Sequence, residues 1–148
     1  MAELRFERAD TEAEQAVRND WRHLHNLIIP TAPLSVEEVE ERAGRNHLEV
    51  AYLDDLAVGC STVRPQAFGT ATVIARVHPG HRQRGFGEQI YQRALATARA
   101  QGAEVIVAVV LASNEDGLRF ALRHGFVETD RYTLPGDTIP FVDLTLRR

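Results

Sequence analysis

The sequence contains no lysine, because all 17 basic residues among its 148 are arginines. This absence excludes chemistry that depends on a lysine side chain: Schiff bases with pyridoxal phosphate or carbonyl substrates, the phosphate contact of a Walker A loop, and serine–lysine hydrolysis. Any anion that the chain binds must therefore contact arginine or backbone N–H groups.

Cysteine is nearly absent, with Cys60 as the single one. It cannot form a disulfide within the chain, and the strand-like residues 57–63 around it are typical of a small buried hydrophobic residue. The net charge is −4, so no basic excess extends over the sequence. We therefore expect that the protein does not bind nucleic acid.

Long hydrophobic runs are also missing. The longest, residues 105–112, is far shorter than the roughly 20 residues that cross a bilayer. Residues 1–8 are charged and lack the apolar stretch of a signal peptide. We therefore expect a cytoplasmic protein without membrane contact. Because no repeat or linker divides the sequence, we also expect one domain over residues 1–148.

Hydrophobic periodicity predicts an α/β (α+β) fold: a mixed, mostly antiparallel sheet of six to seven strands with helices on both faces. Asp10 and Thr11 are expected to cap the first helix. The continuous apolar run 104–111 predicts a central strand covered on both faces. The expected order is strand 4–9, helix 12–27, a helix opened by Ser35, strands 47–53, 56–64 and 71–77, a helix from Gly85 to Gln101, strand 104–111, helix 115–123, and strands 126–134 and 140–146.

Glycines and arginines are concentrated in residues 80–87, GHRQRGFG, between a predicted strand and a predicted helix. The Walker A pattern fails because Phe86 stands in place of its lysine, and the Rossmann pattern fails because Ile90 replaces its third glycine. An anion site remains, formed by N–H groups at a helix start and the charges of Arg82 and Arg84. A tight turn with solvated arginines explains the segment equally well.

The pattern Val77-His78-Pro79 followed by Arg82-x-x-Gly85-x-Gly87 resembles the pyrophosphate loop of the GNAT superfamily, the acyl-CoA-dependent N-acetyltransferases. The later residues Ser113-Asn114, Phe120 and Gly125-Phe126 are similar to the same family, and the expected element order is the GNAT order. The resemblance covers essentially the whole chain and implies a single-domain GNAT-like fold.

The resemblance implies that acetyl-CoA is the cosubstrate and that its acetyl group passes to a primary amine of a small molecule or peptide by direct attack. The strand around Val77 would pair with the pantetheine arm, and a bulge would free the Val77 N–H to polarise the thioester carbonyl. Asn114 would lie near the thiol end, and it would also serve as a helix cap. The resemblance places the pyrophosphate on the N–H groups of Arg82, Gln83, Arg84, Gly85, Phe86 and Gly87.

The sequence departs from the family pattern at two points. Ala121 stands where many members have a tyrosine that protonates the leaving thiolate, which leaves Ser113 and Tyr132 as substitutes. Residues 70–77 contain no glutamate to act as the base. These departures keep open a second function, a non-catalytic acyl-CoA-binding sensor. Four residues are candidates for the base: His25, Glu49, His124 and Glu128.

We expect no metal site, because His23 and His25 lie on different faces of a helix and no acid or cysteine accompanies the other histidines. Residues 29–35 and the final strands are expected to form the acceptor pocket. A homodimer is compatible with the resemblance alone. Two features give opposite indications of the acceptor's charge: a carboxylate would suit Arg64 and Arg76, and a cation would suit the acidic helix face of Glu37, Glu38, Glu40 and Glu41, which is otherwise a solvated surface.

Overall fold

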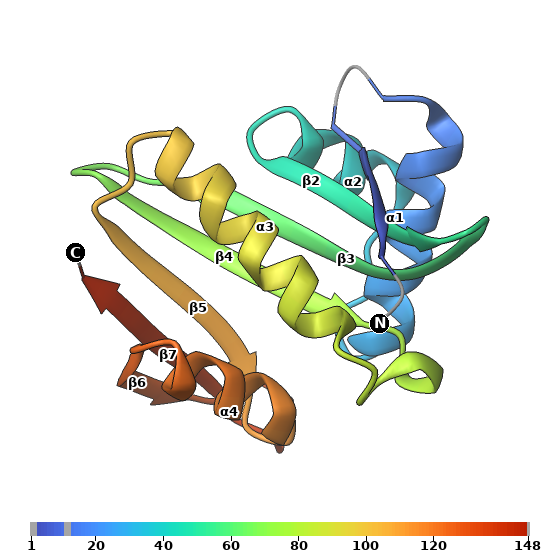
Figure 1. Cartoon of the computed structure of the whole chain (residues 1–148). Helices are drawn as coiled ribbons and strands as arrows, with labels where there is room; N and C mark the ends of the chain where they lie inside the picture. Colours follow the sequence, from blue (N-terminus) through green and yellow to red (C-terminus); the bar gives the residue numbers. More distant parts are fainter. Residues whose placement is uncertain (1–2, 11–12, 148) are drawn as a thin grey trace.

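The computed structural model describes residues 3–10 and 13–147, and in this part of the chain one seven-stranded sheet carries four helices and a short 3-10 turn (Figure 1). The strand order is β1-β2-β3-β4-β5-β7-β6, and all neighbours are antiparallel except β4 and β5. The predicted mixed sheet and element order are confirmed. The elements are β1 (Arg5–Arg8), α1 (Gln15–Ile28), α2 (Val36–Ala43), β2 (His47–Leu53), β3 (Leu56–Pro65), β4 (Thr70–Val77), α3 (Phe86–Ala100), β5 (Val105–Leu111), α4 (Glu115–Arg123), β6 (Val127–Tyr132) and β7 (Phe141–Arg147).

The starts of the first two helices differ in how they are capped. In α2, Ser35 accepts a hydrogen bond from the N–H of Glu38, and the Glu38 carboxylate accepts one from the N–H of Ser35, which completes the expected cap. The predicted cap of the first helix by Asp10 is wrong, because α1 begins after Glu14 and has no side-chain cap. Two residues of the predicted start, Thr11 and Glu12, lie outside the described residues.

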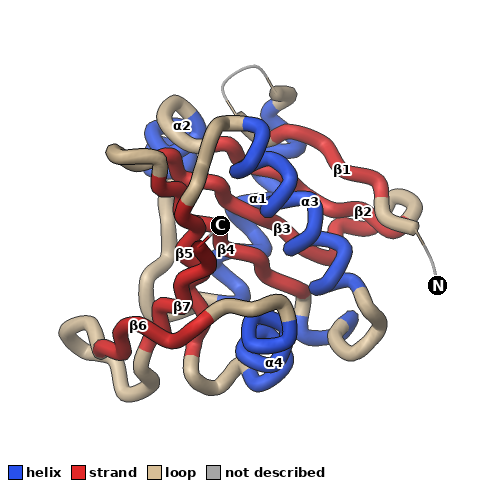
Figure 2. The backbone as a smooth tube through the Cα atoms, turned by 60° about the vertical axis from the view of Figure 1, so that its left-hand side comes forward, coloured by secondary structure: helices blue, strands red, loops and turns tan. Residues whose placement is uncertain are grey.

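The helices cover the sheet in two layers (Figure 2). Helices α3 and α4 pack with one face into a core that includes Ile90, Phe120 and Val110. Helices α1 and α2 pack with the other face into a second core around Trp21. Cys60 belongs to this second core, as predicted, and its burial raises the pKa of the thiol to about 11. An inert structural role for this cysteine follows.

One prediction about the sheet is wrong. Strand β5 is not covered on both faces, because its residues alternate between buried (Ile106, Ala108, Val110) and half-buried. Helix α1 contacts β2, β3 and β4, so its layer ends before β5 on that face. The half-buried face of this central strand leaves room for a ligand beside it.

The parallel pair β4 and β5 separates at its carboxyl end. The strands pair from Thr70 opposite Val105 to Val73 opposite Ala108, and no further. Strand β5 continues instead with β7 as far as Leu111 opposite Phe141. Figure 1 shows the two strands diverging toward the start of α3. This separation creates a gap in the middle of the sheet where backbone groups of β4 lack a partner strand.

A buried ion cluster of Glu49, Arg93 and His47 makes the free energy of unfolding depend on pH in the acidic range. Glu49 is 3% exposed and accepts hydrogen bonds from Arg93 (2.6 Å) and His47 (2.8 Å). Burial alone would raise the pKa of Glu49, but these hydrogen bonds outweigh it and lower the pKa to about 2. The ion cluster therefore stabilises the fold above pH 4.5, and the stabilisation is lost as the pH falls through about 2.

Glu49→Gln is expected to flatten the loss of stability between about pH 5 and pH 2, and to lower stability at neutral pH by roughly 3 kcal/mol. Urea unfolding followed by circular dichroism at each pH measures both effects. The exposed Glu104→Gln is the control. A Glu49 variant with the wild-type pH profile would contradict the assignment.

Candidate active site at the gap between strands four and five

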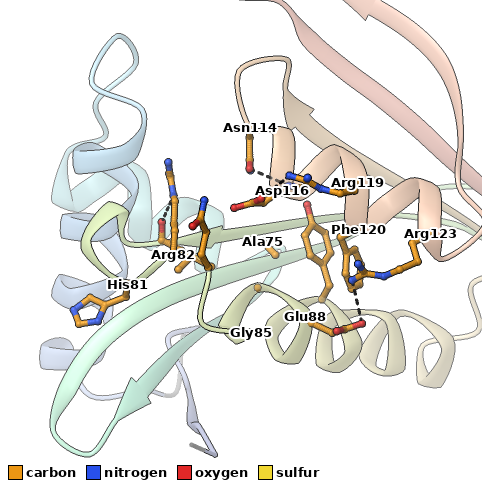
Figure 3. Close-up of a pocket in the computed structure, with 15 residues that line it drawn as sticks. Ala75, His81, Arg82, Gly85, Glu88, Asn114, Asp116, Arg119, Phe120 and Arg123 are labelled. Carbon is orange, nitrogen blue, oxygen red and sulfur yellow. Dashed lines mark hydrogen bonds and ion pairs between the residues drawn. The ribbon is translucent and has the colours of Figure 1, made fainter. Parts of the chain in front are cut away.

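A pocket of about 210 Å³ lies on the α3 and α4 side of the gap. Ala75 and Val77 of β4 form its floor, and the loop before α3 forms one wall. Figure 3 shows Arg82 on this loop and, across the pocket, Arg119, Phe120 and Arg123 of α4. The pocket is thus open to a ligand that runs from the loop along the end of β4.

The loop between β4 and α3 is shaped to present backbone N–H groups. Gln83 and Gly85 both have positive φ, 62° and 80°. Gly85 is the N-cap of α3 and offers no side-chain cap. The first N–H groups of α3 therefore remain available at the positive end of the helix dipole, which is the arrangement that binds phosphate. The strained conformation of Gln83 is typical of functional loops.

The structure separates the side chains that the sequence grouped in this loop. Arg82, Gln83, Gly85 and Gly87 line the pocket. Arg84 does not; its guanidinium lies over the Phe86 ring, 4.9 Å from the centroid, and is 3.1 Å from Nδ1 of His81. Phe86 is 2% exposed and packs in the core. These two residues can contribute only backbone N–H groups to the pocket.

Val77 presents its backbone to the gap. His78 donates its N–H to the Val58 carbonyl (2.8 Å), so alternation along the antiparallel pair turns the backbone of Arg76 toward β3 and that of Val77 toward β5. The Val77 carbonyl accepts a hydrogen bond from Nε of Arg82 (3.2 Å). The expected bulge is absent from the described register of β3 and β4, and the separation from β5 frees the Val77 N–H instead.

A second pocket of about 150 Å³ lies on the other side of the gap. Ile29 and Phe141 line it, as expected for walls built by the loop after α1 and by the final strands. Ser113 and Arg76 also line it. Four residues line both pockets, namely Ala75, Val77, Arg82 and Asn114. The two pockets therefore meet at the end of β4.

Asn114 occupies this meeting point and also caps α4. Its Oδ1 accepts a hydrogen bond from the N–H of Gly117 (3.0 Å). Because the cap fixes the side chain, Asn114 is positioned rigidly beside both pockets. The two expectations for this residue, a cap and a site residue, are compatible in one geometry.

The four candidate bases lie elsewhere, and none lines either pocket. His25 is buried and stacked on Trp21; burial, followed by the charge of Arg76, lowers its pKa to about 4. Glu49 is held by Arg93. His124 contacts Glu88 (2.9 Å), and Glu128 pairs with Arg131 (2.8 Å).

The candidate proton donors Ser113 and Tyr132 lie at different places, and the position of the family tyrosine is occupied by a core residue. Ala121 is fully buried. Ser113 lines only the second pocket. Tyr132 lines neither; its hydroxyl donates to Asp143 (3.0 Å), and its ring stacks on Phe141 of the second pocket. Burial, with this hydrogen bond, raises the pKa of Tyr132 to about 12.

Tyr91 of α3 is a site residue that the sequence did not reveal. It lines the first pocket and stacks on Phe120 with centroids 4.4 Å apart. Its hydroxyl is buried and has no hydrogen-bond partner among the described residues. Burial raises the pKa of this hydroxyl to about 12, against a lowering effect of Arg76. Helical spacing had placed Tyr91 among apolar positions, and no sequence signal distinguishes it from them.

Within residues 3–10 and 13–147, no group of three or more His, Cys, Asp or Glu side chains is arranged to hold a metal ion. In the same ranges no helix has both the length and the apolar character needed to cross a membrane.

Comparison with known proteins assigns the family. Residues 7–126 match the acetyltransferase (GNAT) family, and the chain therefore belongs to it. No protein of curated function matches the chain by sequence at a significant level. Since the match covers most of the chain, this is a member of an acyltransferase family.

Solved structures share the fold at low sequence identity. An N-acetyltransferase from Staphylococcus aureus Mu50 has a TM-score of 0.79 at 17% identity, with 98% of each chain covered. A Bacillus subtilis acetyltransferase in complex with CoA gives 0.70 at 21%, with 99% of each covered. A GNAT family acetyltransferase from Elizabethkingia anophelis with acetyl-CoA bound gives 0.71 at 17%, with 98% of each covered.

Proposed function

We propose that this protein transfers the acetyl group of acetyl-CoA to a primary amine. The observation that carries the proposal is the pair of pockets that meet at Val77, because a donor and an acceptor approaching from opposite sides of the sheet would react there. The structural relatives from Bacillus subtilis and Elizabethkingia anophelis, which hold CoA or acetyl-CoA, support the choice of donor.

The first pocket suits the donor. Uncapped N–H groups at the start of α3 and the guanidinium of Arg82 provide positive charge for the pyrophosphate, without any lysine. The free edge of β4 offers the backbone of Val77 to the amide groups of the pantetheine arm, as an added strand would pair. In this arrangement the thioester lies near the end of β4.

The reaction is a direct displacement at the thioester carbonyl. The amine nitrogen forms the new C–N bond and loses a second proton as the amide forms, the C–S bond breaks, and the thiolate takes up one proton, so that one proton is released to water overall. The Val77 N–H donates to the carbonyl oxygen as negative charge develops on it. An ammonium of pKa about 10 must lose its proton before attack. Because none of the four candidate bases lines a pocket, we assign this proton to water.

The test measures thiol release from acetyl-CoA with a panel of primary amines, together with calorimetric binding of CoA. Amine-dependent thiol release and mass-spectrometric detection of the N-acetyl product support the proposal. Tight CoA binding without turnover on any amine supports the alternative function, an acyl-CoA sensor. The observation that favours this alternative is the buried Ala121, which stands where many family members have a tyrosine.

We assign the protonation of the leaving thiolate to Tyr91, whose hydroxyl has no competing partner among the described residues. Tyr91→Phe is expected to lower kcat about 10- to 100-fold and to leave the KM for acetyl-CoA within about twofold. The reduction lies at the low end for acid catalysis, because a thiolate is a tolerable leaving group. Steady-state kinetics measure kcat and the KM for acetyl-CoA separately.

Tyr132→Phe is the matched control, since its hydroxyl bonds Asp143 and lines neither pocket. Its kcat should stay at the wild-type value. Equal reductions in the two variants, or full activity in Tyr91→Phe, would remove Tyr91 from the mechanism.

A further inference from the structure

We propose that the acceptor amine carries an anionic group, a carboxylate or a phosphonate, held by Arg76 at the second pocket. This inference rests on the proposed function and names the acceptor class. It starts from a group of three arginines, Arg42, Arg64 and Arg76, which we call the arginine cluster. Its members come from α2, β3 and β4.

The arginine cluster lies on the acceptor side of the sheet. In the pairing of β3 with β4, Cys60 stands opposite Arg76, and Arg64 opposite Thr72. Residues at alternate positions share a face, so Arg64 and Arg76 are on the face of Cys60, which packs with α1 and α2. Arg76 lines the second pocket, next to Ser113. A cation is thus placed where the acceptor enters.

Among the described residues the cluster arginines form no direct ion pair, although the charges of Glu41 and Glu38 act on Arg42. In the same part of the chain no hydrogen bond involves the guanidinium of a cluster arginine, although these side chains are only partly exposed. Nε of Arg64 is buried without a hydrogen-bond partner. Other arginines are paired: Arg93 with Glu49 and Arg45 with Glu41. Half-buried cations without an ion-pair partner are unfavourable. This indicates that an anionic ligand pairs with the cluster.

The acidic residues near the cluster have hydrogen-bond partners outside it. Glu41 bonds Arg45, and Glu38 belongs to the capping box of α2. Asp143 of β7 stands opposite Val109 and accepts a hydrogen bond from Tyr132. The predicted acidic rim on α2 is not part of the site, because none of its glutamates lines either pocket. Of the two acceptor charges left open by the sequence, the structure therefore favours the anion.

Electrostatics within the cluster agree with this geometry. Burial is the main cause that lowers the pKa of Arg42; the charges of Arg64 and Arg45 add to it, and those of Glu41 and Glu38 oppose it. Burial likewise lowers the pKa of Arg76, and Arg42 and Arg64 contribute in the same direction. His25 remains neutral beside them. An anion in the second pocket would relieve this repulsion, whereas a cationic side chain on the acceptor would add to it.

Arginine also sets the shape of the group that it binds. Its planar guanidinium donates two parallel N–H bonds to the two oxygens of a carboxylate or phosphonate. The pocket of about 150 Å³ suits a small molecule. The acceptor that follows is a small amino acid or aminophosphonate whose amine reaches the end of β4 while its anion contacts Arg76.

The experiment compares matched acceptors in the thiol-release assay: L-amino acids, their amides, their decarboxylated amines, and the corresponding aminoalkylphosphonates. We expect kcat/KM to be about 10- to 100-fold higher for the anionic members than for their amides and amines. The phosphonate arm shows which anion is preferred. Equal or better turnover of the neutral members would overturn the inference while leaving acetyl transfer intact. The absence of turnover on every amine would overturn the proposed function.

Arg76→Gln tests the residue, and Arg99→Gln on the exposed side of α3 is the matched control. Arg76→Gln should raise the KM for the anionic acceptor about 10- to 100-fold, with kcat and the KM for acetyl-CoA within about twofold. Binding is also measured without turnover, as the rise in melting temperature that the amino acids cause at constant ionic strength. We expect this rise in the wild type and in Arg99→Gln, and we expect it to be lost in Arg76→Gln. A shift retained in Arg76→Gln, or absent from the wild type, would refute the anion site.

Discussion

Replacing Gly85 with glutamate is expected to abolish acetyl-CoA binding, with a loss of more than about 100-fold in affinity. Gly85 has φ of 80° and precedes the uncapped start of α3, in the wall of the first pocket. A glutamate would place bulk and negative charge where the pyrophosphate is proposed to bind. Repulsion between like charges in a partly buried site costs several kcal/mol. Isothermal titration with CoA measures the loss.

Gly102→Glu is the matched control for this substitution. Gly102 also has positive φ, 90°, and a Cβ there would meet no atom within 4 Å. Both variants therefore carry the backbone strain of a non-glycine residue in this region, about 1 kcal/mol or more. Only the Gly85 variant should lose the ligand. A folded Gly85→Glu protein that binds CoA normally would show that the pyrophosphate site lies elsewhere.

Trp21→Ala is expected to destabilise the protein by about 3–5 kcal/mol, the usual result when a large buried aromatic side chain is removed. Trp21 is 1% exposed, anchors α1 in the second core, and donates from Nε1 to the Ser61 carbonyl (3.1 Å). A loss of this size is a large part of the 5–15 kcal/mol that stabilises typical domains. Because Trp21 is the only tryptophan, unfolding must be followed by circular dichroism.

Trp21→Phe separates packing from the hydrogen bond. It keeps an aromatic ring against the sheet but leaves the Ser61 carbonyl without this donor, so about half of the destabilisation should remain. If Trp21→Ala unfolds at the wild-type urea concentration, α1 does not depend on this residue for its anchorage. The position of the helix layer beside the second pocket would then require another explanation.

The elements that periodicity predicted are those whose residues carry a local signal. Ser35 and Glu38 form the expected cap because a capping box depends only on residues three apart. Strand β5 had the composition of a strand covered on both faces, yet one face is half-buried. Its burial depends on where α1 ends, which no window of local sequence contains.

In the candidate site, too, some features follow from local sequence and others only from packing. Glycine spacing and the following helix marked residues 82–87 as an anion loop, and the positive φ of Gly85 is a local requirement that the sequence expresses. By contrast, the four candidate bases could not be ranked from sequence. Packing alone decides that Glu49 pairs with Arg93, far from both pockets.

The sequence by itself determined that arginine must supply any permanently charged side chain that binds an anion, since it has no lysine. It also determined the element order and the position of the glycine-rich loop, because these depend on side-chain type and short spacing. Only the tertiary structure decided that Arg76 lines a pocket, and which arginines and tyrosine hydroxyls lack a partner among residues 3–10 and 13–147. Those facts depend on which distant residues the sheet and helices bring together, and on the separation of β4 from β5.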